Sequence, residues 1–481
     1  MIDFMEKLTR LSERIGPNRV ETGASVIDAY AVDGLRPRAV IFPRNGREVS
    51  EVVRMASREN LSIVPYGSGT KMRMGNVPSR LDLVVASSRM DHMLDVDTAN
   101  LTITVEAGVR FRDIQARLAT EEDRCYLPLE DLSTRGDELI CSDRSNSGSF
   151  LPMDPPFSDS ATIGGIVAAN SSGPRRLLYR FPRDLLLGVR FVAPNGDLIG
   201  TGGKTVKNVS GYDISKLMVG SCGSLGFICD LTFKLLPLPE RMETVFVSFE
   251  SFNDALALGE GILDSPLVPA AVEIMNLTSC EHLSCRERKD VRLSPYAVAV
   301  AIESFEPAVN RMRDEILEMG SRLGSAGHAC FAEEDHRRFW LTVSHLQASA
   351  AGSFSLPVTF QLTYPISCMT EIVAFAEASL FESHMEHTLL VHGGTGASVI
   401  TVSGNLDGGR GGGRSISLIH KLLTQCRESG GNLIIQSAPS ELKPDLKMWG
   451  ESGPDQPVME RIKRELDPFG IFSPGRFVGG L

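Results

Sequence analysis

Short apolar runs in the first half of the chain alternate with apolar residues at helical spacing, which predicts strands connected by helices. Residues 39–42 and 62–64 are predicted strands. Four apolar residues between them mark one face of a helix: Val49, Val52, Val53 and Ala56. Strand–helix–strand units of this kind cross over with a right-handed connection. The second strand leads directly into a glycine turn, Pro65-Tyr66-Gly67-Ser68-Gly69-Thr70.

The same patterns predict how the chain divides. Residues 1–35 are an N-terminal helical segment, and residues 36–240 form the first domain. Within that domain, residues 121–153 are polar and rich in turn-formers, which predicts a long surface loop. Residues 241–430 predict an antiparallel sheet with helices on one face, called the cap domain below. Residues 431–481 are predicted to return to the first domain, so the fold class is α+β.

Composition and charge exclude several classes of protein. The 481 residues are 42% hydrophobic and carry a formal net charge of −11, which argues against a nucleic-acid partner. No apolar run approaches the roughly 20 residues of a membrane-spanning helix. The 9 cysteines include no C-x-x-C, so an iron–sulfur cluster or structural zinc is not expected. Free thiols in a chain of this size indicate a reducing cytoplasm.

Four separated glycine turns carry the candidate chemistry, at residues 67–69, 164–165, 202–203 and 220–226. Gly164 and Gly165 open a run of small residues, and helix starts attract phosphate. A tightly packed core helix explains this pair equally well. A basic cluster at Arg175, Arg176, Arg180 and Arg183 would suit dinucleotide phosphates. The G-x-G-x-x-G, P-loop and G-x-S-x-G motifs are absent, which disfavours a nicotinamide Rossmann domain, a P-loop hydrolase and an α/β-hydrolase.

Six ordered segments resemble the FAD-binding domain of the vanillyl-alcohol-oxidase (PCMH) type. Within that superfamily they are similar to the glycolate oxidase and D-lactate dehydrogenase group, most of all to the FAD-binding second subunit of glycolate oxidase. The segments are Pro65–Thr70, Asp154-Pro155-Pro156, Ala161–Gly165, Asn170–Arg175, Lys207–Asp213 and Gly220–Ile228. The C-terminal Ser473–Gly480 is also typical of that subunit.

The resemblance implies a set of FAD-binding residues. They are Pro65, Gly67, Ser68, Gly69, Thr70, Asp154, Thr162, Gly164, Gly165, Ser172, Gly173, Gly223, Ile228 and Arg476. Ser172 and Gly173 would approach the flavin, and the glycine loops would hold the pyrophosphate. Some relatives attach FAD to a histidine of the first glycine loop, but residues 61–91 contain none, so non-covalent FAD is predicted.

The cap departs from the catalytic relatives, which carry H-x-G-D-G-N-x-H. Here His392 matches the first histidine, but Thr395 replaces the acid and Val399 the second histidine. His392 is therefore the sole catalytic candidate, with a turn or packing role as the simpler interpretation, and no metal is predicted. A solvated helix face is expected at Glu333–Trp340, and Cys222 is expected to be a small buried thiol.

The predicted function is an FAD-dependent oxidoreductase, a flavin-bearing subunit of a complex that oxidises glycolate, D-lactate or a related 2-hydroxy acid. The resemblance implies partners, a catalytic flavoprotein subunit and an iron–sulfur subunit, and is compatible with peripheral membrane association through them. Two alternatives stay open: a stand-alone D-2-hydroxy-acid dehydrogenase with a divergent substrate site, and an FAD-binding scaffold without activity.

Overall fold

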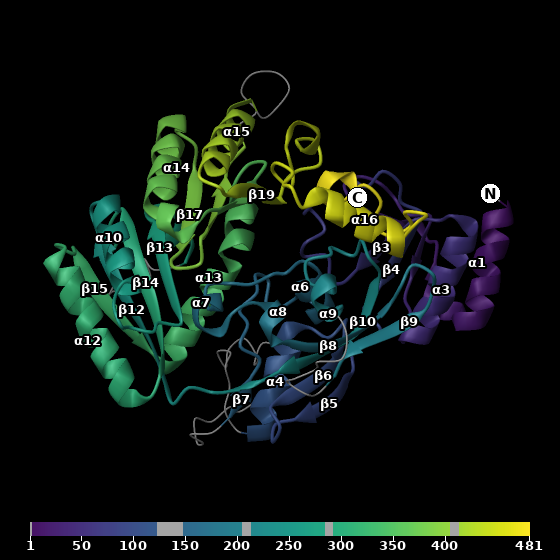
Figure 1. The fold of residues 1–481 in the computed structure, drawn as a ribbon, viewed down its shortest axis with the longest axis horizontal. Coiled ribbons are helices and arrows are strands. Elements are labelled where there is room, and N and C mark those ends of the chain that lie inside the picture. Colours follow the sequence, from purple (N-terminus) through teal and green to yellow (C-terminus); the bar gives the residue numbers. More distant parts are fainter. Residues whose placement is uncertain (1, 123–147, 204–212, 284–291, 405–412) are drawn as a thin grey trace.

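The molecule has two lobes, which Figure 1 shows side by side with the cap domain on the left. The computed structural model describes residues 2–122, 148–203, 213–283, 292–404 and 413–481. The lobe on the right contains both chain ends and two of the sheets. None of the helices in these ranges is long and apolar enough to cross a membrane.

The first sheet confirms the predicted strand–helix–strand unit. Its strands are β1 (Val20–Glu21), β2 (Ala39–Ile41), β4 (Leu83–Ala86) and β3 (Ile63–Tyr66), in that order, and the last three are parallel. Helix α3 (Gly46–Glu59) buries the predicted apolar face. Asn45 caps this helix by accepting hydrogen bonds from the backbone of Arg47 and Glu48. Helix α1 (Ile2–Ile15) packs on α3. Helix α2 (Ala24–Ala29) lies between α1 and α3 in the sequence.

The second sheet is antiparallel, with its strands in the order β5, β6, β10, β8 and β9. Their bounds are Met93–Asp97, Thr102–Glu106, Phe227–Lys234, Leu186–Val192 and Leu198–Gly202. The last two form the hairpin that Asn195-Gly196 predicts, with Gly196 at a φ of 84°. Five helices connect this sheet: α4 (Phe111–Glu122), α6 (Ile163–Ala168), α7 (Arg176–Tyr179), α8 (Pro182–Leu185) and α9 (Ser215–Met218).

The end of the predicted 121–153 loop is core rather than surface. Strand β7 (Ser149–Phe150) pairs with β11 (Leu236–Pro237), and Phe150, Leu151 and Met153 are buried. The loop prediction failed here because these apolar side chains find partners far along the sequence. Residues 123–147 lie outside the described part of the chain.

The cap domain contains one antiparallel sheet of eight strands. Its order is β15 (Gly327–Ala332), β12 (Arg241–Phe249), β14 (Tyr296–Ser304), β13 (Ala271–Asn276), β17 (His387–His392), β18 (Ala397–Val402), β16 (Val358–Thr363) and β19 (Asn432–Ser437). The antiparallel prediction is confirmed. The predicted boundary at residue 430 differs, because β19 is an edge strand of this sheet and the return begins after it.

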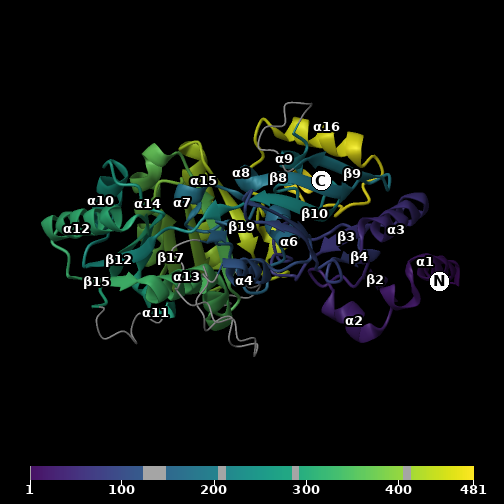
Figure 2. The same ribbon diagram turned by 90° about the horizontal axis from the view of Figure 1, so that it is seen from below.

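Helices cover both faces of the cap sheet, so the prediction of one covered face was wrong. One layer contains α10 (Phe252–Leu263), α12 (Glu306–Arg322), α14 (Met369–Ser383) and α15 (Gly413–Glu428). The opposite layer contains α11 (Leu277–His282) and α13 (Glu333–Ser353), as Figure 2 shows. Phe339, Trp340, Val343 and Leu346 of α13 are buried in a separate core on that face. His336 and Trp340 are therefore core residues, not the solvated face expected at Glu333–Trp340.

The C-terminal return closes the first lobe through buried polar contacts. After α16 (Gln456–Leu466), Phe472 bridges to Ile63 of β3. The Lys463 ammonium donates to Asp467 at 2.6 Å and to the carbonyl oxygen of Ser224 at 2.7 Å. Earlier in the return, Lys443 pairs with Asp33 at 2.8 Å. These contacts fix the C-terminal return against the glycine turns.

Candidate functional site

A large cavity, called the first cavity, lies between the two sheets of the first lobe and holds about 1030 Å³. Its walls are the turn after β3, the start of α6, the turn before β10, and the C-terminal residues Trp449, Ser473 and Arg476. The wall thus combines segments from both ends of the chain.

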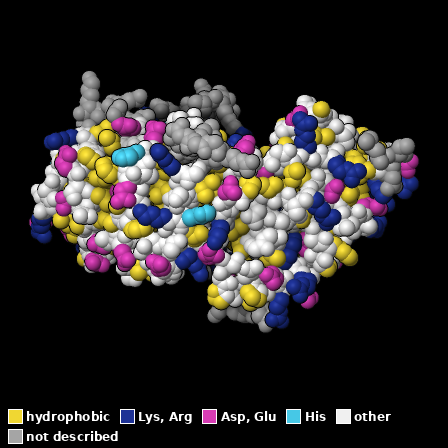
Figure 3. All heavy atoms as spheres, turned by 90° about the horizontal axis from the view of Figure 1, so that it is seen from above, with side chains coloured by type: hydrophobic (Ala, Val, Ile, Leu, Met, Phe, Trp, Pro, Cys, Tyr) yellow, Lys and Arg dark blue, Asp and Glu magenta, His cyan; other side chains and the backbone are white. Residues whose placement is uncertain are grey.

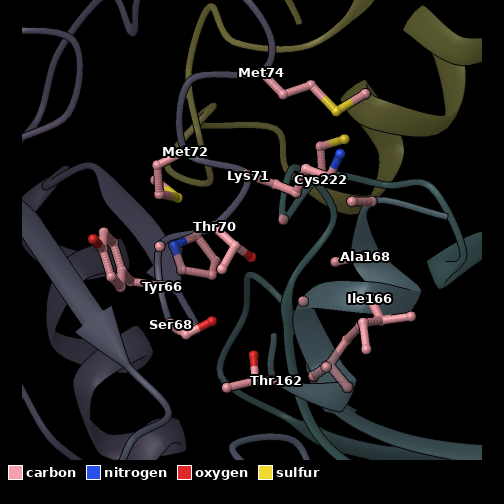
Figure 4. A pocket seen from close by; sticks show the side chains of 18 of the residues that line it. Tyr66, Ser68, Thr70, Lys71, Met72, Met74, Thr162, Ile166, Ala168 and Cys222 are labelled. Atoms are coloured by element: carbon pink, nitrogen blue, oxygen red, sulfur yellow. The ribbon is translucent and has the colours of Figure 1, made fainter. Parts of the chain in front are cut away.

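Eleven of the fourteen predicted FAD-binding residues line the first cavity. They are Pro65, Gly67, Ser68, Gly69, Thr70, Thr162, Gly164, Gly165, Gly223, Ile228 and Arg476. Figure 4 shows the hydroxyl groups of Ser68 and Thr162 at one end and the sulfur-bearing side chains of Met72, Met74 and Cys222 at the other. Hydroxyl groups thus lie at one end of the cavity, and sulfur-bearing side chains together with Lys71 lie at the other.

The first glycine turn has no room for side chains. A Cβ atom on Gly67 would lie 2.2 Å from Oγ1 of Thr162, and one on Gly69 would lie 2.3 Å from the Tyr66 hydroxyl. Gly69 also has a φ of 85°, a conformation that favours glycine. The turn can thus present bare backbone to a ligand, as binding of a pyrophosphate requires.

Gly164 has a packing role as well as a place in the cavity wall. Its N–H donates to the carbonyl oxygen of Ala107 at 2.9 Å, and a Cβ atom would lie 2.6 Å from that of Ala107. Its N–H is therefore not available for phosphate, contrary to the expectation for this helix start. In the turn at 202–203, Gly202 packs against the backbone of Leu187, and neither glycine lines the first cavity. Lys207–Asp213 of the resemblance lie outside the described residues, apart from the last.

One polar atom of the cavity wall is left without a hydrogen-bond partner among the described residues. Oγ1 of Thr162 is buried without a hydrogen bond to any described residue. An unsatisfied buried hydroxyl is costly, so a polar ligand atom is its natural partner. Arg476 is buried and donates hydrogen bonds to the carbonyl oxygens of Met72 and Met74, both at 2.9 Å. These bonds hold in place the loop that contains the two methionines at the cavity wall. These features fit FAD.

A second cavity of about 730 Å³ lies between the first lobe and the cap. Lys71, Pro156, Ala169 and Ser171 line both cavities and so form their common wall. Cap residues complete the second cavity, among them Gln361, His392 and Gln436. A ligand in the second cavity is therefore adjacent to the contents of the first.

The other three predicted FAD residues, Asp154, Ser172 and Gly173, line the second cavity instead of the first. Asp154 accepts hydrogen bonds from the backbone N–H groups of Gly173 and Arg175 at 3.1 and 2.9 Å. Burial raises the pKa of Asp154 to about 6, with Arg175 opposing the shift. Asp154 thus shapes the turn that leads into α7.

His392 lines the second cavity at the end of β17 and pairs with a buried acid. Its Nδ1 lies 2.8 and 2.9 Å from the two carboxyl oxygens of Glu273 on β13. Burial, assisted by Arg176, lowers the pKa of His392 well below its usual value, and burial raises the pKa of Glu273. The imidazole is neutral at physiological pH, and its Nε2 makes no hydrogen bond with a described residue.

The basic cluster does not gather around the first cavity as expected for phosphate binding. Arg175 forms a buried pair with Glu303 of the cap, while Arg176 lines the second cavity. Arg180 and Arg183 are exposed. On the face drawn in Figure 3, Lys and Arg side chains are interspersed with Asp and Glu.

Several wall residues were not identified from the sequence. Lys71 follows the first glycine turn directly, and burial lowers its pKa to about 8. Its ammonium lies 3.4 Å from Oε1 of Gln436 on β19, a contact that no sequence pattern signals. Trp449 and Glu273 were likewise not identified, and Arg176 was expected only within the basic cluster for dinucleotide phosphates. Cys222, expected to be a small buried thiol, is only partly buried, and desolvation raises the pKa of its thiol to about 11.

Comparison with known families identifies both lobes. The FAD binding domain family matches residues 37–130 and 143–202, and the family of FAD linked oxidases, C-terminal domain, matches residues 238–438. The chain belongs to the FAD-linked oxidases. It is thus an FAD-dependent oxidoreductase, and FAD is its cofactor.

Curated relatives of this FAD-linked oxidase extend over nearly its whole length. Glycolate oxidase subunit GlcD of Bacillus subtilis is 29% identical and covers 98% of this chain and 96% of its own. A D-lactate dehydrogenase of Anaerostipes hadrus is 22% identical over 96% of this chain and 95% of its own. Among solved structures, p-cresol methylhydroxylase shares the fold with a TM-score of 0.73 at 15% identity, covering 98% and 96% of the two chains.

The cap segment that departs from the catalytic relatives begins at His392 and contains the β17–β18 hairpin. The glycines after His392 form the tight β17–β18 hairpin, with Gly394 and Gly396 at φ values of 72° and 64°. Thr395 donates its hydroxyl to the carbonyl oxygen of His392 at 3.0 Å. In the part of the chain that the structure describes, no three His, Cys, Asp or Glu side chains gather as they would around a metal ion.

Proposed function

We propose that this FAD-linked oxidase oxidises a small 2-hydroxy acid, such as glycolate or D-lactate, to the 2-oxo acid. The observation that carries the proposal is the second cavity, which shares a wall with the first and holds Arg176, Lys71 and His392. Two cations suit an anionic substrate, and a neutral histidine suits removal of a hydroxyl proton. The glycolate- and lactate-oxidising relatives support the same substrate class.

The reaction removes a hydride from the hydroxyl-bearing carbon and a proton from its oxygen. When bound, FAD supplies the hydride acceptor. His392 is proposed to accept the proton through Nε2, while Glu273 holds Nδ1 and fixes the orientation of the ring. Burial keeps the ring unprotonated before the substrate binds. The cap strands that form the wall restrict access of water to the cavity.

We further infer that the chain works as a flavin-bearing subunit in the cytoplasm. The word subunit in the name of the Bacillus subtilis relative supports a complex. Because the sequence has no cysteine motif for an iron–sulfur cluster, an iron–sulfur subunit and a second, catalytic flavoprotein subunit are proposed to carry electrons onward. Any membrane association would be peripheral and would pass through these partners. Five described cysteines, Cys222, Cys229, Cys330, Cys368 and Cys426, are free thiols, which supports a reducing compartment.

The test is anaerobic addition of glycolate or D-lactate to the purified, FAD-loaded chain. Loss of the visible absorbance of the flavin, with formation of one 2-oxo acid per flavin, is the expected result. Bleaching followed by rapid turnover with a dye but without partners would instead indicate a stand-alone dehydrogenase. Stable FAD binding with no bleaching by any 2-hydroxy acid, alone or with the co-expressed partners, would overturn the proposal in favour of a scaffold.

A further inference from the structure

Arg176 is an unusual cation because it is buried without a carboxylate partner. Only 8% of its surface is exposed, and it lines the second cavity at the start of α7. Its Nη1 donates to the hydroxyl of Ser172 and its Nη2 to the hydroxyl of Thr395, both at 3.3 Å. Its Nε is buried without a hydrogen bond to any described residue. Two long bonds to neutral groups leave most of its donor capacity unused.

The preceding residue, Arg175, provides a comparison because its guanidinium is paired with a carboxylate. Arg175 donates from Nε to the carboxylate of Glu303 at 2.5 Å and contacts His336 at 3.1 Å. It lines no part of the second cavity. The two neighbouring arginines therefore divide their roles: Arg175 joins the lobes, and Arg176 keeps its charge available on the cavity side.

No described carboxylate hydrogen-bonds to Arg176, although Glu273 and Asp154 lie near enough to oppose the lowering of its pKa by burial. Glu273 engages His392, and burial raises its pKa and favours its neutral form. Asp154 accepts two backbone hydrogen bonds. Burial lowers the pKa of Arg176 itself, as expected for a guanidinium without a full counter-charge. Lys71 adds a second cation at the common wall. Arg176 and Lys71 thus place two cations on the wall of the second cavity, which also contains the carboxyl group of Asp154.

We propose that Arg176 binds the carboxylate of the substrate. A carboxylate at this position would give Nε the acceptor that it lacks and could make the paired hydrogen bonds that a guanidinium forms best. The anchored end would then lie beside the hairpin that follows His392, because Thr395 of this hairpin already contacts Arg176. The hydroxyl-bearing carbon next to the carboxylate would be held close to His392. The inference rests on the proposed function for the choice of substrate class only.

The test measures binding without turnover. Oxalate has two carboxylates and no C–H bond, so the flavin cannot oxidise it, and its binding is followed by the change in the visible spectrum of the FAD-loaded protein. Arg176→Gln should raise the Kd for oxalate at least tenfold, and Arg176→Lys should lie between the two. Arg183→Gln removes an exposed arginine of the same cluster and should bind oxalate like the wild type.

Glycolamide, an uncharged analogue, separates charge recognition from packing. The proposal expects its affinity to be equal in the wild type and in Arg176→Gln. Equal weakening of oxalate and glycolamide, or loss of FAD in both Arg176 variants, would overturn the proposal by showing a structural role. Unchanged oxalate binding in Arg176→Gln would overturn it too. If oxalate binding depends on Arg176 but no 2-hydroxy acid bleaches the flavin, the carboxylate site stands and the proposed function fails.

Discussion

Arg175 of the first lobe donates to Glu303 of the cap sheet at 2.5 Å, and both side chains are almost fully buried. Tyr179 donates to the same carboxylate at 2.6 Å, and Nε2 of His336 lies 3.2 Å away. The pair belongs to a polar cluster that joins α7 to the cap. Because α7 also begins with Arg176, this cluster fixes the position of the second cavity's guanidinium.

Replacing Glu303 by Gln should destabilise the protein strongly. The change leaves Arg175 as a buried charge without its counter-ion, which costs about 3–5 kcal/mol in the free energy of unfolding. Urea denaturation measures the loss. Glu318→Gln removes an exposed partner of Arg322 and should cost no more than about 1 kcal/mol. Similar losses in the two variants would contradict the role of the buried cluster.

The same carboxylate should give the protein an acid-dependent stability. Burial alone would raise the pKa of Glu303, but Arg175, His336 and Tyr179 outweigh it and lower the pKa to about 2. The contribution is thus present above the unfolded pKa of about 4.3 and is lost as the pH falls towards 2. The difference in stability between wild type and Glu303→Gln should shrink over that interval.

Gly67→Ala should lower the FAD content of the purified protein. The added methyl group would lie 2.2 Å from Thr162 Oγ1, which forces the glycine turn or the start of α6 to move. We expect the Kd for FAD to rise at least tenfold, measured by titrating the apoprotein with FAD. Gly261→Ala is the control, because a methyl group added there would meet no neighbouring atom within 4 Å. Full FAD occupancy in Gly67→Ala would contradict the assignment of the turn.

The FAD is expected to be released on denaturation. The described wall of the first cavity contains no histidine for covalent attachment, and the thiol of Cys222 is held neutral by a pKa raised to about 11. A neutral thiol is a poor nucleophile. After acid precipitation, the yellow colour should remain in the supernatant. Colour that stays with the chain in the wild type but not in Cys222→Ser would show that this prediction is wrong.

His392→Asn should slow reduction of the flavin by the substrate roughly 10²- to 10⁴-fold, the usual contribution of a general base. Stopped-flow measurement of the bleaching rate tests this, with FAD content as a check on folding. Because the pKa of His392 is lowered, the acid limb of the wild-type rate profile should lie well below the ordinary histidine pKa of about 6.5. His420→Asn, an exposed change on α15, should leave rate and profile unchanged.

Lys71 should make anion binding sensitive to alkaline pH. Its pKa is lowered to about 8 by burial, with Cys222 weakly opposing, so the ammonium loses its proton as the pH rises through this value. The affinity for oxalate should therefore fall above pH 8 in the wild type. Lys71→Arg keeps its charge throughout and should remove this dependence. An identical alkaline fall in Lys71→Arg would assign the titration to another group.

The sequence determined those features whose physical cause is local. Glycine turns, helix faces and the Asn195-Gly196 hairpin depend on the conformations open to a few adjacent residues, so their patterns were sufficient. The resemblance predicted FAD as the cofactor. It could do so because each of its six segments is a short run of adjacent residues. Eleven of the predicted residues line one cavity.

Only the tertiary structure decided which chemical groups meet in the second cavity. His392 pairs with Glu273 across 119 residues, Arg175 with Glu303 across 128, and Lys71 with Gln436 across 365. Such pairs depend on the order of the cap strands and on which helix covers each face, and no local pattern specifies these. Arg175 and Arg176 therefore looked alike in the sequence. In the fold, Arg175 pairs with Glu303 of the cap, whereas Arg176 lines the second cavity, where we propose that it binds the substrate carboxylate.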